Sequence, residues 1–300
     1  MKLGLGTVQF GLNYGVSNRS GIVAPSEVKN VLACAAKSGA VGYLDTATAY
    51  GSAEEVLGAT LEQRHPFKIV TKTPTFKDSL ISSESADELE RSFRKSLLRL
   101  NQTAVYGLLA HHASPLLDRD GAFLFDRMLK LKEQGVVKKI GVSVYSAEEI
   151  DRVIERYPVE LIQAPVSLLD QRLVTGGHLA RLNERGIEVH ARSVFLQGLL
   201  LMEADNIPRN LASIQEHLGN LRAEVEARGL TMLQAALGFV LNLEAVTACL
   251  VGVCSLSELN QILEAARLAQ EKKFEISGVA ASAAWDDERV LNPFFWEKYA

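Results

Sequence analysis

Polar residues end six short apolar runs of this sequence, at positions where their side chains could do chemistry. The six residues carry a charge, an imidazole, an amide or a hydroxyl: Asp45, Lys72, His111, Ser143, Gln163 and Arg192. An unpaired polar group is costly inside an apolar core. We therefore expect these side chains to face a hydrated mouth that holds a ligand.

A tyrosine follows the first of these residues at short spacing. Tyr50 lies five residues after Asp45 in the segment DTATAYG, and Lys72 ends the next apolar run. An isolated phenol has a pKa of about 10, too high for an efficient proton donor at neutral pH. A neighbouring ammonium would stabilise the phenolate and lower that pKa, and Asp45 would keep Lys72 charged. The spacing predicts Tyr50 as a general acid, with His111 orienting a carbonyl.

The same residues have ordinary structural interpretations. Asp45 and Lys72 could form an ion pair that only closes the sheet, and His111 could be a core histidine. The remaining strand-end residues could be simple hydrogen bonders or partners of an acid; these are Ser143, Gln163 and Arg192.

The other histidines offer no second chemistry. His112 would point away from His111 if the alternation of strand side chains continued past the run. The remaining four lack metal-ligand spacing, and we expect them at surface or helix positions: His65, His178, His190 and His217.

The elements that must position these residues alternate along the chain. Eight apolar, β-branched runs read as strands: LGLGTV, VGYLD, KIVTK, YGLLAH, KKIGVS, VELIQ, IEVHAR and ACLVGV. Helical periodicity appears at Ser26–Lys37, Ser52–Glu62, Ser85–Leu100, Gly121–Glu133, Ala147–Arg156 and Ser257–Leu268. Strands that are apolar on both faces indicate a parallel sheet, and eight such units predict a (β/α)₈ TIM barrel. An open, doubly wound sheet is the alternative.

Two segments go beyond a minimal barrel. Between Ile207 and Leu243 lie two helical patterns, EHLGNLRAEVEAR and TMLQAALGFVLN, and we interpret the first as an extra helix before the last strand. The tail WDDERVLNPFFW could cover the barrel mouth. We find no linker, so residues 1–300 are expected to form a single domain.

Composition excludes several classes of partner. The net charge of -4 gives no attraction to nucleic acid, and no apolar run approaches the length of about 20 residues that crosses a bilayer. The N-terminus lacks an apolar signal region, and the three cysteines form no CxxC pair, which speaks against zinc or disulfides. We expect a cytoplasmic protein without a metal, acting on a small molecule as a monomer or weak homo-oligomer.

Several segments together resemble the aldo-keto reductase family. They are DTATAYGSAEEVLG, the lysine of IVTK, the histidine of LLAH, IGVS, IQAPVSLLDQR, RSVFLQGLL and LVGVCSLSEL. The resemblance covers nearly the whole chain. It implies a barrel enzyme that reduces an aldehyde or ketone with hydride from a nicotinamide, with Tyr50, Lys72, Asp45 and His111 in the catalytic roles. In keeping with this, the glycine cluster GLGTVQFG lacks the spacing of a Rossmann fingerprint.

The resemblance also implies a cofactor site. Ser143 and Gln163 match contacts to the carboxamide, and Arg192 stands where an aromatic residue often stacks on the nicotinamide. Ser193, Phe195 and Gly198 match the loop over the pyrophosphate. The full set of implied cofactor residues is Thr7, Asp45, Ser143, Gln163, Arg192, Ser193, Phe195, Gly198, Val253 and Ser257.

The chain departs from the family pattern near the nucleotide and the substrate. Val144 follows Ser143 where many members have Asn. Members that prefer NADP(H) carry Lys or Arg where this chain has Cys254, Ser255, Ser257 and Glu258. A carboxylate repels a phosphate, so NADP(H) stays the favoured cofactor with NAD(H) as the alternative.

The substrate pocket is expected to be polar. His112 stands where many members have Trp, and Val8 replaces another bulky residue, while Phe76 could supply a wall. Further walls could come from the tail residues Phe294, Phe295 and Trp296. Such a mouth suits a sugar-like or otherwise hydroxylated aldehyde.

Two other functions stay open. Related barrels can serve as non-catalytic, nicotinamide-binding redox sensors, against which the intact catalytic residues argue. A lyase or aldolase could instead form a Schiff base on Lys72. That chemistry needs a lysine of depressed pKa, whereas Asp45 would raise it.

Overall fold

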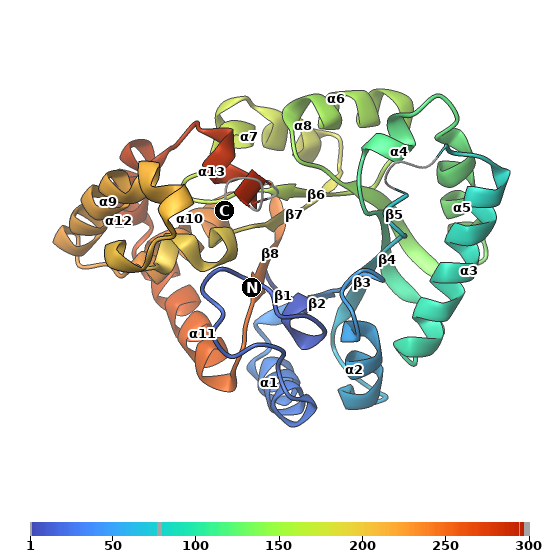
Figure 1. The fold of residues 1–300 in the computed structure, drawn as a ribbon, viewed down its shortest axis with the longest axis horizontal. Coiled ribbons are helices and arrows are strands. Elements are labelled where there is room, and N and C mark those ends of the chain that lie inside the picture. The colour runs from blue at the N-terminus through green and yellow to red at the C-terminus, as the bar shows by residue number, and fades with distance from the viewer. Residues whose placement is uncertain (1, 77–79, 294, 297–300) are drawn as a thin grey trace.

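In the computed structural model, which describes residues 2–76, 80–293 and 295–296, eight parallel strands close into a barrel ringed by helices (Figure 1). Each strand pairs with the next along the chain, and β8 pairs with β1. The strands are β1 (Leu3–Gly6), β2 (Val41–Asp45), β3 (Lys68–Lys72), β4 (Val105–Ala110), β5 (Val137–Ser143), β6 (Leu161–Pro165), β7 (Glu188–Arg192) and β8 (Val246–Gly252). The predicted (β/α)₈ barrel is confirmed, and the open sheet is excluded.

The six expected helical segments all form helices, with ends that differ by a few residues. They are α1 (Pro25–Ser38), α2 (Ala53–Thr60), α3 (Ser83–Arg99), α5 (Ala122–Glu133), α6 (Ala147–Arg156) and α11 (Leu256–Glu271). Shorter or later helices are α4 (Ser114–Leu117), α7 (Arg172–Thr175), α8 (His178–Glu184), α12 (Lys273–Ala283) and α13 (Glu288–Leu291). None of the helices described combines the length and apolar character that a membrane span requires.

An extra helix precedes the last strand, as predicted. Between β7 and β8 the chain forms α9 (Gln215–Ala227) and α10 (Met232–Asn242), which lie with α12 on one side of the barrel (Figure 1). Three short 3₁₀ turns connect β7 to α9, namely Leu196–Leu201, Ala204–Asn206 and Arg209–Ile214.

Alternation along the strands separates an apolar layer from a polar mouth. Tyr43, Val70 and Leu161 belong to one buried cluster inside the barrel. Residues two positions further along a strand point to the same side. The next inward residues on β2 and β3 are therefore Asp45 and Lys72, one step nearer the carboxyl ends.

His190 lies inside the barrel, so the expectation of a surface or helix position was wrong. It is on β7 with 0% exposure, and its ring lies edge-on to Tyr43 with 4.7 Å between centroids. Burial lowers the pKa of His190 to about 4, which keeps the ring neutral. Side chains along a strand alternate between its two faces. The neighbours of His190 on β7 face outward, so His190 faces the inside of the barrel.

The tail lies at the carboxyl end of the barrel. The Trp285 amide donates to the Leu169 carbonyl in the loop after β6, at 3.0 Å. The indole of Trp296 donates to the Val290 carbonyl, and Asn210 donates to the Trp296 carbonyl, both at 3.0 Å. These contacts fix the tail over the connections that follow β6 and β7.

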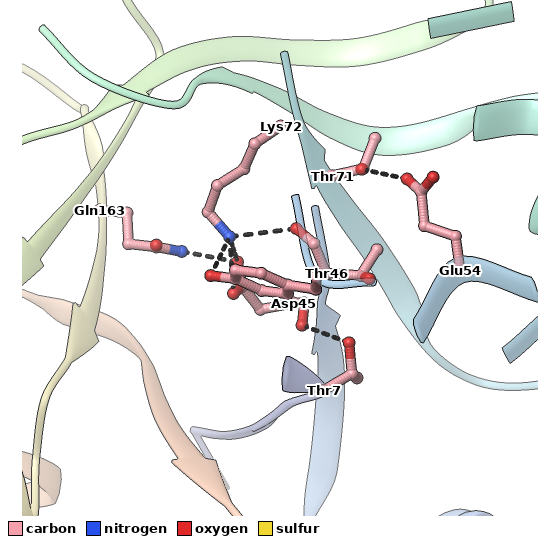
Figure 2. Close-up of polar contacts among 8 residues, drawn as sticks. Thr7, Asp45, Thr46, Glu54, Thr71, Lys72 and Gln163 are labelled. Atoms are coloured by element: carbon pink, nitrogen blue, oxygen red, sulfur yellow. Dashed lines mark hydrogen bonds and ion pairs between the residues drawn. The ribbon is translucent and has the colours of Figure 1, made fainter. Parts of the chain in front are cut away.

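A buried carboxylate joins three elements beneath the mouth. Glu54 on α2 is 1% exposed, and its Oε1 accepts from the Thr71 hydroxyl at 2.7 Å (Figure 2). Its Oε2 accepts from Nε and Nη2 of Arg99 on α3, at 2.8 and 2.6 Å. Thr71 directly precedes Lys72, so Glu54 fixes the strand end that carries the lysine.

Glu54→Gln should lower the free energy of unfolding by about 1–3 kcal/mol, because it weakens charge-assisted hydrogen bonds in a buried site. Urea unfolding monitored by circular dichroism measures this. The control is Glu55→Gln, since Glu55 lies 3.6 Å from Arg99 with its side chain 53% exposed. It should change stability by about 0.5 kcal/mol or less. Equal losses for the two variants would contradict the assigned role.

Candidate active site

The polar strand ends meet at one cavity. A cavity of about 680 Å³ opens at the carboxyl ends of the strands, within the range of roughly 300–1,000 Å³ that small-molecule sites occupy. Tyr50 lines it together with all six predicted strand-end residues: Asp45, Lys72, His111, Ser143, Gln163 and Arg192. The barrel thus brings together residues that are up to 147 positions apart (45 to 192).

Asp45 and Lys72 form a buried ion pair. Lys72 Nζ donates to Asp45 Oδ1 and Oδ2 at 2.9 and 2.7 Å, and to the Thr46 carbonyl at 3.1 Å (Figure 2). Gln163 Nε2 donates to Asp45 Oδ1 at 2.6 Å. Burial by itself would lower the pKa of Lys72, but the Asp45 carboxylate and Tyr50 together outweigh it and the pKa is raised. Lys72 is therefore an ammonium at neutral pH.

Tyr50 lies against this ammonium. Lys72 Nζ is 3.3 Å from Tyr50 Oη and 4.9 Å from the centre of its ring. Two glycines let the loop take this course. Gly51 has a φ of 56°, and a Cβ on Gly11 would lie 2.0 Å from the Tyr50 carbonyl oxygen. Only a residue without a side chain fits at Gly11.

The environment of Tyr50 corrects one part of the sequence prediction. Burial raises the pKa of the phenol, and the Lys72 ammonium opposes that rise without cancelling it. The expectation that Lys72 would bring the pKa below its ordinary value was wrong in net direction, because the buried site penalises the phenolate more. Tyr50 is therefore fully protonated at neutral pH, and the phenolate left after proton loss would face an ammonium.

His111 is neutral and adjacent to the phenol. Its ring lies edge-on to Tyr50, with 6.1 Å between centroids. Burial and the nearby Lys72 charge lower the pKa of His111 to about 3. Its Nδ1 is buried, with no hydrogen-bond partner among the residues that the structure describes. A neutral imidazole in this place can hydrogen-bond a ligand oxygen.

His112 lies on the same side as His111, contrary to the alternation argument. The two rings stack with 5.0 Å between centroids and 14° between planes. The strand ends at Ala110, so strand alternation no longer applies to either histidine. His112 itself is not among the residues that line the cavity.

Arg192 stacks on an aromatic ring that the sequence reasoning did not identify. Its guanidinium carbon lies 4.2 Å from the centre of Tyr145, which also lines the cavity. Nη2 donates to the Val144 carbonyl at 2.9 Å, and Nη1 donates to Ser193 Oγ at 3.2 Å. The structure records no ion pair between Arg192 and a carboxylate of the described chain, so that alternative is wrong.

Some implied ligand residues line the cavity and others do not. The lining includes Val8, Ser193, Phe195 and Gly198. Thr7 is fully buried, and its hydroxyl donates to the Asp45 carbonyl at 3.0 Å, so it holds the end of β2 (Figure 2).

Five further described residues that were expected at the ligand site do not line the cavity. Phe76 and Val253 are buried in the core outside the barrel lumen, at 8% and 1% exposure. Ser257 is exposed on α11, and Trp296 lines a second, smaller cavity with Arg209 to Ser213. Phe294 lies outside the described residues, and Phe295 is absent from the cavity lining.

The loop between β1 and α1 is a part of the site that sequence reasoning missed. Tyr14 Oη accepts from Gln197 Nε2 at 3.1 Å, and Ser17 Oγ donates to the Gln197 carbonyl at 3.3 Å. A Cβ on Gly198 would lie 1.9 Å from Ser17 Oγ, so this glycine permits the close approach of the two loops. The available signal was the long polar stretch GLNYGVSNRSG after the first strand, which adds Tyr14, Gly15, Ser17, Asn18, Arg19 and Ser20 to the lining.

A carboxylate lies at the amino end of α11, at the far edge of the cavity lining. Glu258 Oε2 accepts from the Cys254 amide at 2.6 Å, and Ser255 Oγ accepts from the Glu258 amide at 3.2 Å. Ser255 is thus the N-cap of α11, and Glu258 also binds the residue that precedes this N-cap. Burial and Glu258 raise the pKa of Cys254 to about 11, so the thiol is unreactive at neutral pH.

The polar groups near Tyr50 match a carboxamide. Gln163 donates its amide nitrogen to Asp45, which leaves its carbonyl oxygen to accept from a ligand, and Ser143 can supply a hydroxyl. A carboxamide has a donor and an acceptor side by side, so this end of the cavity fits a nicotinamide. The described residues contain no group of three or more side chains able to hold a metal ion.

Comparisons with known proteins identify relatives of this chain. The sequence profile of the Aldo/keto reductase family matches residues 2–281. The chain is 26% identical over 264 residues to the uncharacterized oxidoreductase YqkF of Bacillus subtilis, covering 82% of this chain and 84% of that protein. It is 29% identical over 150 residues to aldo-keto reductase family 1 member A1-A of Danio rerio, covering 44% and 46%.

Solved structures share the fold. The aldo-keto reductase AKR11C1 from Bacillus halodurans, in its holo form, matches with a TM-score of 0.76 at 20% identity, over 96% of this chain and 95% of that chain. PA4992 from Pseudomonas aeruginosa matches with a TM-score of 0.66 at 23% identity, over 90% of each chain. At these identities the likeness concerns the fold alone. The profile match over residues 2–281 shows that the chain belongs to the aldo-keto reductase family.

Proposed function

We propose that this protein reduces an aldehyde or ketone to an alcohol with a nicotinamide dinucleotide, and that Tyr50 is the general acid. One observation carries the proposal. A protonated phenol lies 3.3 Å from an ammonium that is itself ion-paired, inside a cavity that holds a neutral histidine.

Each of the four polar residues around the carbonyl has a separate role in this proposal. The cofactor supplies hydride when bound. His111 donates a hydrogen bond that orients the carbonyl oxygen, and Tyr50 gives this oxygen its proton. Lys72 stabilises the phenolate that forms, while Asp45 keeps the lysine charged and directed at Tyr50.

The cavity supports a dinucleotide reaching from Tyr50 toward α11. We assign Ser143 and Gln163 to the carboxamide, and the loop with Ser193, Phe195 and Gly198 to the pyrophosphate. Thr7, Val253 and Ser257 do not line the cavity, and Thr7 supports it through the hydrogen bond to the Asp45 carbonyl. NADP(H) is the cofactor that the family resemblance favours, while Glu258 favours NAD(H).

The substrate side supports a polar carbonyl compound. Val8 leaves room at the wall, and the hydroxyls and charges of the mouth suit a sugar-like or otherwise hydroxylated aldehyde. A panel of aldehydes and ketones in which only bulky apolar ketones are turned over would contradict this.

Lys72 is poorly suited to the lyase alternative. Schiff-base formation requires a neutral amine, and the ion pair with Asp45 raises the pKa of Lys72. A redox-sensing regulator would bind the cofactor without turnover. Stopped-flow oxidation of bound reduced cofactor by an aldehyde panel separates that function from the reductase.

Tyr50→Phe should lower kcat by about 100-fold or more, because it removes the proton donor and little volume. Fluorescence titration should give a cofactor Kd close to that of the wild type. Tyr14→Phe is the matched control, since this phenol also lines the cavity but is bonded to Gln197 rather than Lys72. Retained turnover in Tyr50→Phe would refute the assignment.

Carbonyl reduction should be insensitive to pH between about 6 and 9. The pKa of Tyr50 is raised, so the acid stays protonated, and the His111 pKa of about 3 keeps that ring neutral. Alcohol oxidation needs the phenolate and should accelerate with rising pH. Single-turnover rates in both directions measure this, and a reduction limb that titrates between about pH 6 and 7 would assign the acid to a histidine instead.

Glu258→Gln should raise the ratio of NADPH affinity to NADH affinity by about 10-fold, because it removes a charge that repels a 2′-phosphate. Glu264→Gln on the same helix is the control, since Glu264 does not line the cavity. Fluorescence titrations with both reduced cofactors give the two Kd values. A ratio unchanged in both variants would mean that Glu258 has no part in cofactor choice.

A further inference from the structure

A continuous belt of rings runs along one side of the mouth and ends in a cation. The ring belt consists of Tyr50, His111, His112, Tyr145 and Arg192. Successive ring centroids are 6.1, 5.0 and 6.0 Å apart, and the Arg192 guanidinium carbon is 4.2 Å from the Tyr145 centroid. The belt links the guanidinium to the phenol through three intervening rings.

Electrostatics agree with this position. Burial is the main cause of the low pKa of His111, and Arg192 is among the charges that lower it further. Arg192 also opposes the rise in the pKa of Tyr50. The guanidinium therefore acts on both residues that would hold the carbonyl oxygen.

Arg192 forms no ion pair with a carboxylate in the part of the chain that the structure describes. The charged side chains that line the cavity are three cations and two carboxylates, namely Arg19, Lys72, Arg192, Asp45 and Glu258. Lys72 is neutralised by Asp45, and Glu258 accepts from a backbone amide on the α11 side. Arg192 bonds a carbonyl and a hydroxyl, both uncharged, and forms no ion pair within the described residues.

The guanidinium of Arg192 is held in one orientation and retains N–H donors that could bind a ligand. A guanidinium carries five N–H donors, and the contacts to Val144 and Ser193 use two of them. The stack on Tyr145 fixes its plane. A guanidinium with a fixed plane and free N–H donors can bind a carboxylate or a phosphate through two parallel hydrogen bonds.

We propose that Arg192 binds an anionic group of the substrate, so that the enzyme acts on carbonyl compounds bearing a carboxylate or a phosphate near the carbonyl. Tyr145 is the positioning residue that holds the guanidinium in place. The inference rests on the proposed reductase function and deepens it.

Matched substrate pairs test the charge requirement. The carboxylate pair is succinic semialdehyde and butanal, and the phosphate pair is glyceraldehyde 3-phosphate and glyceraldehyde. For the wild type, kcat/KM should be higher for the charged member than for the neutral member of at least one pair. The pair that shows this difference identifies the bound group as a carboxylate or a phosphate. Arg192→Gln should lower the ratio of kcat/KM for the charged member to kcat/KM for its neutral partner by about 10- to 100-fold.

Three further variants separate positioning from general charge. Arg192→Lys keeps the charge without the planar fork and should recover part of the preference. Tyr145→Leu should lose the preference and Tyr145→Phe should keep it, since only the stack matters. Arg19→Gln removes an exposed cation of the same cavity lining and should leave the charged-to-neutral ratio unchanged.

A binding measurement distinguishes failure of this inference from failure of the proposed function. Succinate and inorganic phosphate are titrated into the complex of the enzyme with reduced cofactor, monitored by cofactor fluorescence, and Arg192→Gln should weaken the tighter anion by at least about 10-fold. The inference is overturned if Arg192→Gln lowers both members of each pair equally, or weakens cofactor binding while charge preference stays unchanged. If the wild type turns over no carbonyl, the reductase proposal fails, and the anion titration still decides the role of Arg192.

Discussion

A lysine and an aspartate buried together impose the main constraint on this structure. Lys72 and Asp45 have side-chain exposures of 1% and 6%. Removing one partner of a buried pair leaves an uncompensated charge, which typically costs about 3–5 kcal/mol. The surrounding fold satisfies both groups, with Gln163 and the Thr46 carbonyl supplying further hydrogen bonds. The pair also gives the phenol of Tyr50 its cationic neighbour.

Support for this pair extends outward through the barrel. Thr7 holds the backbone at Asp45, and Glu54 holds Thr71 next to Lys72 while binding Arg99 on a neighbouring helix. Neither Thr7 nor Glu54 lines the cavity. Catalytic geometry depends on such supporting contacts, because side chains held by a single contact sample several rotamers.

Burial and charge act in opposite directions on the groups of the mouth. Burial raises the pKa of Tyr50 and lowers that of His111, so both are held in their neutral forms. Of Tyr50, His111 and Lys72, only Lys72 stays charged, because Asp45 and Tyr50 together outweigh the cost of its burial. The arrangement places an ammonium beside a neutral phenol, with a neutral imidazole next to that phenol. Arg192 adds a second cation to the cavity lining.

The sequence by itself determined the barrel and the identity of the strand-end residues. Eight apolar runs alternate with helical periodicity, and parallel strands carry their polar ends to one face. This pattern was sufficient to predict that Asp45, Lys72 and His111 line one cavity. It failed wherever a residue lay just beyond a strand, as with His112, because strand alternation ends with the strand.

Only the tertiary structure decided how loops and burial complete the site. The loop after the first strand contacts the loop after the seventh through Tyr14 and Gln197, positions that no local pattern relates. The stack of Arg192 on Tyr145 joins the ends of β7 and β5 in the same way. The direction of the pKa shift of Tyr50 depends on how deeply the folded chain buries the phenol. The residues next to Tyr50 in the sequence do not specify that depth. Neither of two segments that are distant in the chain indicates by its own sequence that it contacts the other. Such contacts are defined only when the closed barrel brings the two segments together.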